Sequence, residues 1–376
     1  MKLSDYDYAL PQELIAAHPL EDRAAARLIR VDRKTGTLSH HTFREIQHFL
    51  EPGDLLVLND TKVIPARIFG RKRTGGKVEA LLLKEQARGE WEALLRPGGR
   101  IKKGTVIQFG ENGVRLEAEV LEDSRADSAG RRLRFSPPAV REMLEKIGHT
   151  PLPPYIGRRD TEADKVNYQT VFAQNPGAVA SPTAGLHFDR ELLDVLLQKG
   201  IEIVTVTLHV GYGTFQTIPC EDLSRHQMLE EEFEVTESSA EKINRAISGN
   251  RRIIACGTTV VRTLESAAIS PHPAPLPRGE GKEIPSPLRE KARMRVKVGS
   301  GKTKLFIYPP YPFKIVDGLI TNFHLPKSTL LLLTAAFLAH GAGARHAPPL
   351  LLLDIYREAA RRRYRFYSYG DAMLIL

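Results

Sequence analysis

Three histidines in separate loops are the side chains of this sequence best suited to proton transfer. They are His187, His209 and His324. Because imidazole titrates near neutral pH, each is a candidate general acid or base. A single histidine beside a glycine is more often structural, but three in comparable loops favour a shared pocket. We therefore take them as the candidate catalytic residues, with His209 and His187 ahead of His324.

Two glycine-containing loops have the composition of ligand-binding turns. The segment Gly257-Thr258-Thr259 opens a predicted helix, whose free backbone N–H groups can hold a carboxylate or a phosphate. An ordinary helix cap is the alternative, and for a lone Gly-Thr-Thr it is the commoner one. Gly211 and Gly213 permit either close backbone approach to a ligand or a simple tight turn, and both interpretations stay open.

Buried strands are predicted to position most of these loops. Apolar, β-branched runs at 201–210, 251–256 and 319–321 each end directly before one loop. In an open α/β sheet, ligands bind outside the carboxyl ends of the strands, so we expect the loops to converge in one cleft. The four loops are 181–188, which precedes a helix capped by Asp189, and 209–215, 257–259 and 322–326.

The order of the predicted elements indicates two domains. From 63 to 135, short β-type segments recur between turns such as Asn112-Gly113, and about six strands favour a small barrel or sandwich. After 153, strands, including one predicted at 305–308, alternate with helices, which is typical of a layered α/β domain. The fold class is therefore a layered α/β main domain interrupted by an inserted small antiparallel β-barrel. The predicted main domain comprises residues 1–62 and 154–376, and the barrel comprises residues 63–153.

Residues 270–295 differ in composition from both domains. Six prolines lie between Pro271 and Pro287, and large apolar side chains are almost absent. Such a composition cannot form a core, so a disordered surface insertion is predicted. A polyproline II docking ligand is the less favoured alternative.

The formal net charge of +9 favours an anionic partner, and nucleic acid is the commonest large one. A basic surface without a partner is the alternative. For any single basic cluster, a solvated face is the usual interpretation. Two clusters lie on the predicted barrel, however, and make it a candidate RNA-binding surface. The basic residues of these two clusters are Arg71, Lys72, Arg73, Arg100, Lys102 and Lys103, and a third cluster lies at 361–363.

Other features of the sequence argue against several classes of protein. Cys220 and Cys256 are the only cysteines, and they lack metal-ligand spacing, so we expect no metal. Two acids near the N-terminus argue against an export signal. The most apolar stretch, 330–339, is far shorter than the ~20 residues of a membrane span. We expect a cytoplasmic monomer without a membrane partner.

Motifs along nearly the whole chain resemble one enzyme family in their order. They occupy residues 56–67, 151–157, 168–171, 181–188, 209–215, 257–266, 316–330 and 364–373. Together they resemble the S-adenosylmethionine:tRNA ribosyltransferase-isomerase family of queuosine biosynthesis. The resemblance implies that the ribosyl moiety of S-adenosyl-L-methionine is transferred to 7-aminomethyl-7-deazaguanine at the tRNA wobble position and isomerised. The implied products are epoxyqueuosine in the tRNA, adenine and methionine.

Three features depart from the pattern of that family, and one of them is the 341–353 segment, which is longer and more proline-rich than expected. The 270–295 insertion is not part of that pattern, and because it lies in a connection we expect it to leave the chemistry intact. Leu229 stands where family members often have a second histidine after His226. We therefore give the 226–230 segment no catalytic role.

Residue chemistry suggests how such a reaction would be divided among the candidate residues. The sulfonium acidifies the neighbouring C5′ protons, so the site needs a base, a cation-tolerant pocket and an acid for adenine. Tyr308, Tyr311 and Phe313 are candidates for cation–π contact with the sulfonium. Thr258 and Thr259 are candidates for binding the methionine carboxylate. The other candidate substrate-binding residues are Asp60 for the amine or a ribose hydroxyl, Glu265 for a ribose hydroxyl, and Thr61, Lys62, Arg67, Ser181, Thr183, Gly185, Gly211, Gly213, Thr214 and Gly257.

Two rival functions belong to other classes. An S-adenosylmethionine-dependent RNA methyltransferase needs a glycine-rich loop after its first strand and an acid after its second, and we do not find that pair. A non-catalytic RNA-binding protein would bind tRNA through the barrel without affinity for S-adenosylmethionine. Product analysis and calorimetry respectively distinguish these rivals from the transferase.

Overall fold

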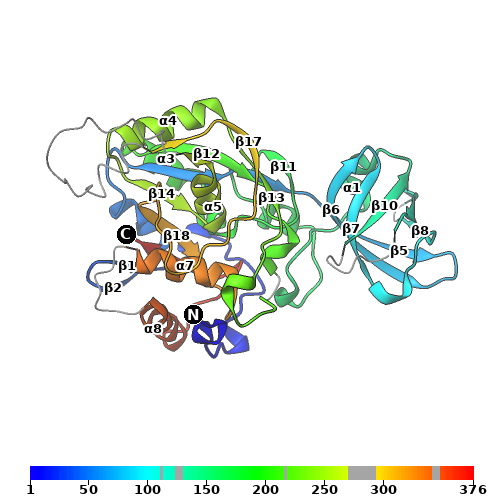
Figure 1. Cartoon of the computed structure of the whole chain (residues 1–376), viewed down its shortest axis with the longest axis horizontal. Helices are drawn as coiled ribbons and strands as arrows, with labels where there is room; N and C mark the ends of the chain where they lie inside the picture. The colour runs from blue at the N-terminus through cyan, green and yellow to red at the C-terminus, as the bar shows by residue number, and fades with distance from the viewer. Residues whose placement is uncertain (111–112, 123–129, 216–217, 270–293, 341–347) are drawn as a thin grey trace, which may run out of the picture.

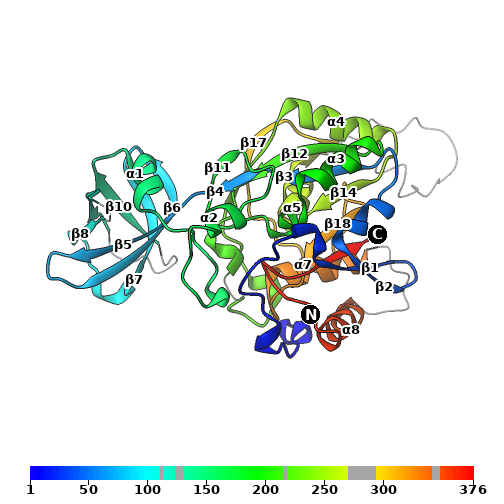
Figure 2. The ribbon, with the colours of Figure 1, turned by 180° about the vertical axis from the view of Figure 1, so that it is seen from behind.

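A computed structural model of the chain describes residues 1–110, 113–122, 130–215, 218–269, 294–340 and 348–376. A large body of sheet and helices carries a small barrel at one side (Figure 1). Seen from behind, extended segments near β4 join the two parts (Figure 2). The predicted fold class, a layered α/β domain interrupted by an antiparallel barrel, is confirmed.

Nine strands form the main sheet, in the order β17-β13-β12-β3-β14-β18-β19-β1-β2. The neighbours β12, β3, β14 and β18 run parallel, so their carboxyl ends share one edge, which we call the carboxyl edge. Of these, β3, β14 and β18 are buried throughout, as their continuous apolar runs predict. The bounds are β1 Arg27–Val31, β2 Leu38–Thr42, β3 Leu55–Asn59, β12 Glu202–Leu208, β13 Glu231–Val235, β14 Ile253–Cys256, β17 Gly299–Thr303, β18 Gly318–Asn322 and β19 Ala372–Ile375.

Helices cover both faces of this sheet. Leu55 and Val57 pack with apolar residues of α4, α5, α7 and α8, whereas Leu56 and Leu58 pack with α3 and η4 on the opposite face. This alternation follows from the two-residue period of a strand. The helices are α1 Val140–Ile147, α2 Asp164–Asn167, α3 Arg190–Gln198, α4 Glu237–Ser248, α5 Thr258–Ala267, α7 Thr329–Ala339 and α8 Pro348–Arg361. Short 3-10 helices are η1 Leu3–Tyr6, η2 Gln12–Leu14, η3 Arg23–Ala25, η4 Phe43–His48, η5 Gly98–Arg100, η6 Pro154–Ile156, η7 Thr183–His187, η8 Tyr212–Phe215 and η9 Leu223–Arg225.

Side chains cap two helices at their N-termini, one of them at the predicted residue Asp189. Asp189 Oδ1 accepts a hydrogen bond from the Leu192 backbone N–H at 2.7 Å and begins α3. Ser328 Oγ accepts one from the Leu331 N–H at 3.2 Å and begins α7. Each cap satisfies a backbone donor that the helix itself leaves unbonded. No helix in the described part of the chain combines the length and apolarity needed to cross a membrane.

Six antiparallel strands close the barrel in the order β10-β7-β6-β5-β8-β9. Residues 116–120 alternate as in a half-buried strand, because Leu116, Ala118 and Val120 are buried while Glu117 and Glu119 are not. Residues of α1 complete the barrel core. The barrel strands are β5 Arg67–Lys72, β6 Lys77–Ala87, β7 Glu90–Arg96, β8 Val106–Phe109, β9 Leu116–Val120 and β10 Gly130–Ser136. At the joint, β4 Thr61–Val63 pairs with β11 Asn175–Ala178.

The prediction of a strand at 305–308 is wrong. That segment is irregular, and the edge strand is instead β17, which a Gly-Ser-Gly-Lys-Thr sequence of low β propensity does not predict. The carbonyl oxygen of Leu305 accepts a hydrogen bond from Arg262 Nε at 3.1 Å, so a side chain takes the place of a strand partner.

The ends of the predicted insertion lie side by side. Residues 270–293 are outside the described residues, as is the predicted polyproline alternative. The flanking strands β15 Ala268–Ile269 and β16 Arg295–Val296 form an antiparallel pair, with Ala268 opposite Val296. The chain therefore leaves and re-enters the main domain at one place.

Candidate functional site

Asn59 ties together three strand ends at the carboxyl edge. Its amide Nδ2 donates to the Leu208 carbonyl at 3.0 Å and to Thr259 Oγ1 at 3.2 Å. Its Oδ1 accepts from the backbone N–H of Thr61 and of Leu208, both at 3.1 Å. This buried side chain at the end of β3 thus holds the starts of the 209–215 and 257–259 loops together. The sequence analysis did not select Asn59 as a site residue.

His209 lies beside these hydrogen bonds of Asn59. Its Nδ1 is 2.8 Å from Thr61 Oγ1. A side chain at position 177 would place its Cβ 2.8 Å from the His209 ring, so Gly177 makes room for the imidazole. Burial lowers the pKa of His209, while the charges of Glu232 and Asp60 act in the opposite direction. His209 is only partly buried, and Thr61 leaves its Nε2 for another partner.

Asp60 is fixed rather than free. Its buried Oδ1 accepts hydrogen bonds from Thr207 Oγ1 at 2.6 Å and from Asn175 Nδ2 at 3.0 Å. The neighbouring Lys62 points into solvent, because it is exposed between two buried residues of β4. We call Asn59, Asp60, Thr61 and His209 the His209 cluster.

A second cluster forms around Asn322, at the end of β18. The amide Nδ2 of Asn322 lies 3.0 Å from His187 Nε2, and its Oδ1 accepts from Thr183 Oγ1 at 3.0 Å. His324 Nε2 lies 2.7 Å from Thr321 Oγ1. We call His187, Thr183, Asn322 and His324 the Asn322 cluster. It brings the 181–188 and 322–326 loops together, as the sequence predicted they would be.

The two histidines of the Asn322 cluster are neutral at physiological pH. Burial, with the charges of Arg365 and Arg23, lowers the pKa of His187 to about 3. Burial alone lowers the pKa of His324 to about 3. An imidazole with so low a pKa is a weak proton acceptor, because a good general base has a pKa near the working pH. Of the three candidates, His209 is therefore best suited to proton abstraction.

Two cavities open beside the Asn322 cluster and share Ser368 in their linings. The smaller, of about 50 Å³, is lined by Ser181, Thr183, Asn322, His324, Tyr155 and Tyr367 among others. The larger, of about 460 Å³, reaches His187 from the side of His18 and Arg23. The Ser181 hydroxyl is buried and has no hydrogen-bond partner among the described residues. A polar ligand group in the smaller cavity would supply one.

Aromatic rings also line the smaller cavity. Tyr155 and Tyr367 stack with ring centroids 4.5 Å apart, and Tyr155 Oη lies 2.6 Å from Ser368 Oγ. Such ring faces attract a cation. Sequence reasoning did not select these tyrosines or Ser368, although all three lie within segments that resemble family motifs.

Several predicted residues lie at the other edge of the main sheet. Glu265 lies in the last turn of α5, and its carboxylate accepts hydrogen bonds from the backbone N–H groups of Lys314 and Ile315 at 3.0 Å each. Tyr311 and Phe313 contact each other edge-to-face, with ring centroids 4.9 Å apart, in that same segment, which leads to the amino end of β18. Because α5 begins at the carboxyl edge and runs away from it, these three side chains hold the fold rather than line the cavities. Tyr308 stacks on Phe306, with ring centroids 4.9 Å apart, and does not line the cavities either.

The predicted glycines occupy tight turns. Gly257 has φ +96°, which favours glycine, and its N–H donates to the Ile320 carbonyl at 2.8 Å. The Gly211 N–H donates to Glu231 Oε1 at 2.9 Å, which is a structural use of that loop. A Cβ at position 185 would lie 2.7 Å from the Phe172 ring, and one at 213 would lie 3.1 Å from Leu229. Thr258 is buried at the start of α5, and the Thr214 side chain lies outside the described part of the chain.

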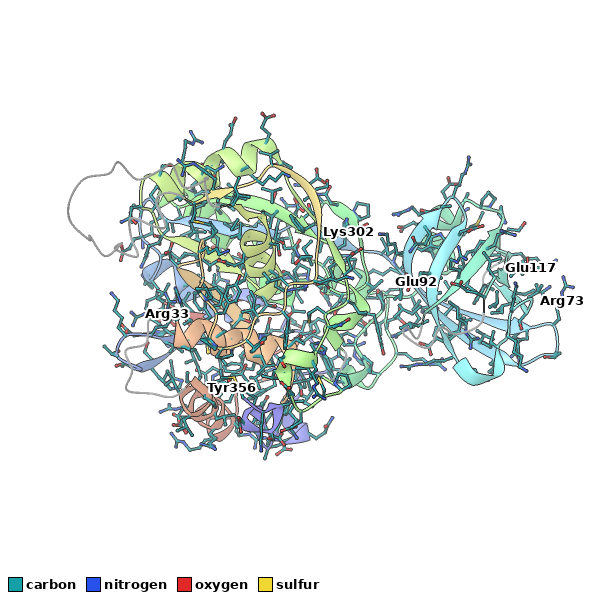
Figure 3. The ribbon with its side chains drawn as sticks, viewed as in Figure 1. Arg33, Arg73, Glu92, Glu117, Lys302 and Tyr356 are labelled. Carbon is teal, nitrogen blue, oxygen red and sulfur yellow. The ribbon has the colours of Figure 1, made fainter. Side chains whose placement is uncertain are left out.

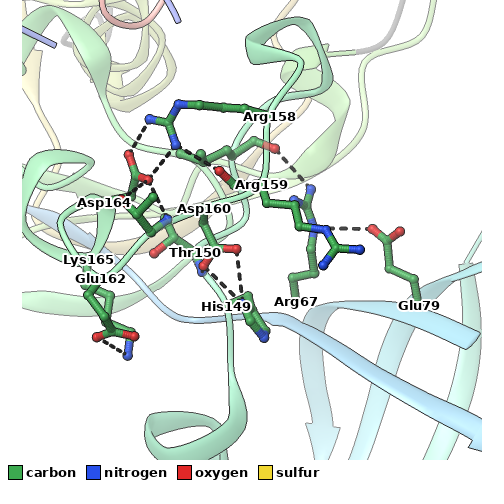
Figure 4. Close-up of polar contacts among 12 residues, drawn as sticks. Arg67, Glu79, His149, Thr150, Arg158, Arg159, Asp160, Glu162, Asp164 and Lys165 are labelled. Carbon is green, nitrogen blue, oxygen red and sulfur yellow. Dashed lines mark hydrogen bonds and ion pairs between the residues drawn. The ribbon is translucent and has the colours of Figure 1, made fainter. Parts of the chain in front are cut away.

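Arg67 belongs to the joint between the barrel and the main domain (Figure 4). Its Nη2 donates to the Leu152 carbonyl at 3.0 Å, and its Nε lies 3.2 Å from Glu79 Oε1. Nearby, Arg158 Nη1 pairs with Asp164 Oδ2 at 2.7 Å. Burial acts to raise the pKa of Asp164, but hydrogen bonds from Arg158 and other donors hold that pKa well below its usual range.

The predicted basic clusters are distributed over the barrel. Arg71 and Lys72 end β5, and Arg73 follows at the outer end of the barrel, where it pairs with Glu117 at 3.6 Å (Figure 3). Lys102 and Lys103 are exposed in the segment before β8, and the Arg100 side chain lies outside the described part. Across the described residues, no group of histidine, cysteine and acidic side chains has an arrangement that could hold a metal ion.

Comparison with known proteins gives consistent matches over the length of the chain. The family model described as queuosine biosynthesis protein matches residues 3–375. An S-adenosylmethionine:tRNA ribosyltransferase-isomerase of Thermotoga petrophila is 47% identical over 376 residues, covering 100% of both chains. The protein of that name from Clostridioides difficile is 45% identical over 377 residues, again covering 100% of both. The crystal structure of S-adenosylmethionine tRNA ribosyltransferase from Thermotoga maritima is similar, with 39% identity, a TM-score of 0.50 and coverage of 99% of this chain and 100% of that one.

Proposed function

Because the chain belongs to the queuosine biosynthesis protein family, we propose that it is the transferase that converts 7-aminomethyl-7-deazaguanine at the tRNA wobble position to epoxyqueuosine. S-adenosyl-L-methionine donates the ribosyl moiety, which is isomerised on transfer, and adenine and methionine are released. The sequence motifs predicted this family and enzyme class, and the comparisons confirm both.

The observation that carries the proposal is the convergence of the loops at the carboxyl edge. Asn59 bonds to both Leu208 and Thr259, and Asn322 bonds to both His187 and Thr183. The Gly257 N–H bonds to the Ile320 carbonyl between them. Segments far apart in the sequence thus meet at the edge where an open α/β sheet binds ligands. This supports one site for a nucleoside substrate.

His209 is the proposed general base. When its Nδ1–H donates to Thr61 Oγ1, the lone pair of Nε2 is free to accept the C5′ proton that the sulfonium acidifies. The resulting imidazolium can then return a proton to the departing adenine. The charges of Glu232 and Asp60 favour this imidazolium, because both act to raise the pKa of His209.

The Asn322 cluster and its cavities are the proposed pocket for the donor. The faces of Tyr155 and Tyr367 suit the sulfonium, and they replace Tyr308, Tyr311 and Phe313 in this proposed role. The Ser181 hydroxyl, which lacks a partner among the described residues, suits a ribose hydroxyl. The neutral His187 and His324 act as hydrogen-bonding groups that position the pocket, not as bases.

The start of α5 is the proposed contact for the methionine carboxylate. Free N–H groups of a helix N-terminus attract anions. Thr259 Oγ1 is held by Asn59, which places this turn beside the His209 cluster. The carboxylate would therefore lie at the edge of the same site.

Product analysis tests the proposed function. The protein is incubated with S-adenosylmethionine and tRNA that carries 7-aminomethyl-7-deazaguanine. The mass of the modified nucleoside is then measured by mass spectrometry. We expect epoxyqueuosine, with adenine and methionine in equal amounts. Formation of S-adenosylhomocysteine would indicate a methyltransferase instead. Binding of tRNA without calorimetric binding of S-adenosylmethionine would indicate a non-catalytic RNA-binding protein.

A further inference from the structure

A large hollow of the described surface lies on the barrel, away from the proposed catalytic site. Its volume is about 1580 Å³. It begins at the joint, with His149, Arg159 and Asp160, and ends among residues of β5, β6, β8 and β9 that include Glu117. Figure 3 places Glu117 at the outer end of the barrel, so the hollow extends outward from the main domain. We call it the barrel hollow.

Positive charge in the barrel hollow exceeds negative charge. Its exposed cations are Arg71, Lys77, Arg96, Arg115 and Arg159, and no described carboxylate forms an ion pair with any of them. The acids Glu79 and Glu117 also line it, but each pairs with an arginine outside the lining, Arg67 at 3.2 Å and Arg73 at 3.6 Å. The third acid, Asp160, contacts His149 Nδ1 at 3.1 Å. The hollow therefore has a surplus of cations to offer an anion.

Two of these cations face each other across a strand pair. Arg71 of β5 is directly opposite Lys77 of β6 in the antiparallel register. Like charges at opposed positions destabilise a sheet. On the other side of Arg71, its partner in β8 is the neutral Gln108. A phosphate between Arg71 and Lys77 would relieve the repulsion, so this arrangement suits a polyanion.

An exposed aromatic ring lies on the same face of β5. Phe69 is two residues before Arg71, so both side chains point outward from the barrel. Phe69 is 45% exposed, and the ring of His149 contacts it edge-on with centroids 5.0 Å apart. The backbone of His149 pairs with Arg67, which fixes the histidine against the strand. The exposed part of the Phe69 ring is thus left for a ligand.

We propose that the barrel hollow binds unpaired nucleotides of the RNA substrate, with phosphates at Arg71 and Lys77 and one base stacked on Phe69. Proteins recognise single-stranded RNA by combining a basic groove with aromatic platforms, whereas duplex RNA cannot present a base to a ring. The inference rests on the proposed function, because it takes tRNA as the macromolecular substrate. It assigns the loop nucleotides to Phe69 and its cationic neighbours, of which only Arg71 belonged to the clusters predicted from the sequence.

Binding of a fluorescent anticodon stem-loop of the substrate tRNA, measured by anisotropy over a range of salt concentrations, tests the proposal. The double variant Arg71→Gln/Lys77→Gln should weaken binding and reduce the slope of log K against log salt by about 1.4, or about 0.7 for each phosphate that is no longer neutralised. Phe69→Leu should weaken binding roughly tenfold without changing the slope, and Phe69→Tyr should restore it. A matched control is Arg88→Gln/Lys146→Gln, which removes two exposed barrel cations outside the hollow.

A salt slope for Arg71→Gln/Lys77→Gln equal to that of the control would overturn the proposal, as would unchanged affinity of Phe69→Leu. Unaltered thermal melting of each variant confirms that the barrel remains folded. Product formation by the wild type is measured separately. Wild-type binding without product would overturn the proposed reaction alone, whereas product formation with unaffected variants would overturn the barrel hollow alone. Absence of both stem-loop binding and product formation by the wild type would overturn both.

Discussion

At the carboxyl edge of the main sheet, polar side chains are buried and bonded to one another, whereas in the barrel hollow the cations are exposed and form no ion pair with a described carboxylate. Asn322 illustrates the first arrangement, with both ends of its amide occupied. Arg71 and Lys77 illustrate the second, opposed across a strand pair. The first arrangement fixes geometry for a small substrate, because little reorganises on binding. The second supplies charge that a flexible polyanion can neutralise in several ways.

The largest expected effect concerns the proposed base. His209→Ala should lower the rate of adenine release roughly 10²–10⁴-fold, the usual contribution of general acid–base catalysis. The measurement is single-turnover kinetics with saturating S-adenosylmethionine and tRNA. His226→Ala is the matched control, because that ring packs on Phe306 with centroids 4.9 Å apart and has no proposed role. Near-normal turnover of His209→Ala would remove this residue from the mechanism.

Replacing Asn322 should break the bonded arrangement itself. Asn322→Leu leaves the buried His187 Nε2 without that partner, at about 1–3 kcal/mol of unfolding free energy, and also removes the hydrogen bond of the partly buried Thr183 Oγ1. Urea denaturation measures this loss, and turnover should fall with it. Asn244→Leu is the control, because it also removes two hydrogen bonds, to Val296, but far from the site. Equal turnover of the two variants would show that Asn322 has only a structural role.

The neutral histidines should make stability depend on pH. The folded pKa of His187 and of His324 is about 3, below the ordinary value of 6.5, so the unfolded chain binds protons that the folded protein does not. Stability is therefore complete above about pH 6.5 and declines as the pH falls toward 3, by about 1.4 kcal/mol per pH unit for each histidine. Urea midpoints at pH 6 and pH 5 measure the slope. His324→Gln should reduce this slope by the contribution of one histidine. An unchanged slope would contradict the argument that burial lowers the pKa of His324.

The smallest expected effect concerns the Ser181 hydroxyl. Because it lacks a partner among the described residues, Ser181→Ala should change the free energy of unfolding by less than about 0.5 kcal/mol. The dissociation constant of S-adenosylmethionine should nevertheless rise severalfold, since a hydrogen bond contributes about 0.5–1.5 kcal/mol. Thr183→Val is the contrasting control, because its hydroxyl is already bonded to Asn322 and its removal should destabilise the protein. Calorimetry measures the binding, and an unchanged dissociation constant for Ser181→Ala would place the ligand elsewhere.

Patterns of apolar residues predicted the frame of the molecule. The runs at 201–210, 251–256 and 319–321 became β12, β14 and β18, and the loops after these strands met at one edge as expected. The barrel followed from the recurring short β-type segments and the turn residues between them. The edge strand β17 could not be predicted, because its glycines and lysine carry no β signal and its pairing with β13 decides its conformation.

Side-chain partners were harder to predict than strands. Glu265 belongs to the helix that opens at Gly257-Thr258-Thr259, but two helical turns carry it away from the carboxyl edge to the 314–316 backbone. Nothing in the residue type of Asn59 shows that it bonds to two other segments. In the barrel, runs of consecutive cations drew attention to 71–73, whereas the alternation of Phe69 and Arg71 with buried Ile68 was the signal for an outward-facing pair.

The antiparallel contact between β15 and β16 has a practical consequence for the 270–293 segment between them. Since Ile269 and Arg295 are opposite each other, a tight hairpin turn can span the gap in the chain. The segment can therefore be exchanged for a short linker, a fluorescent label or an affinity handle while both cut ends stay anchored. A label or an affinity tag can therefore be inserted at this position, away from the loops of the proposed catalytic site.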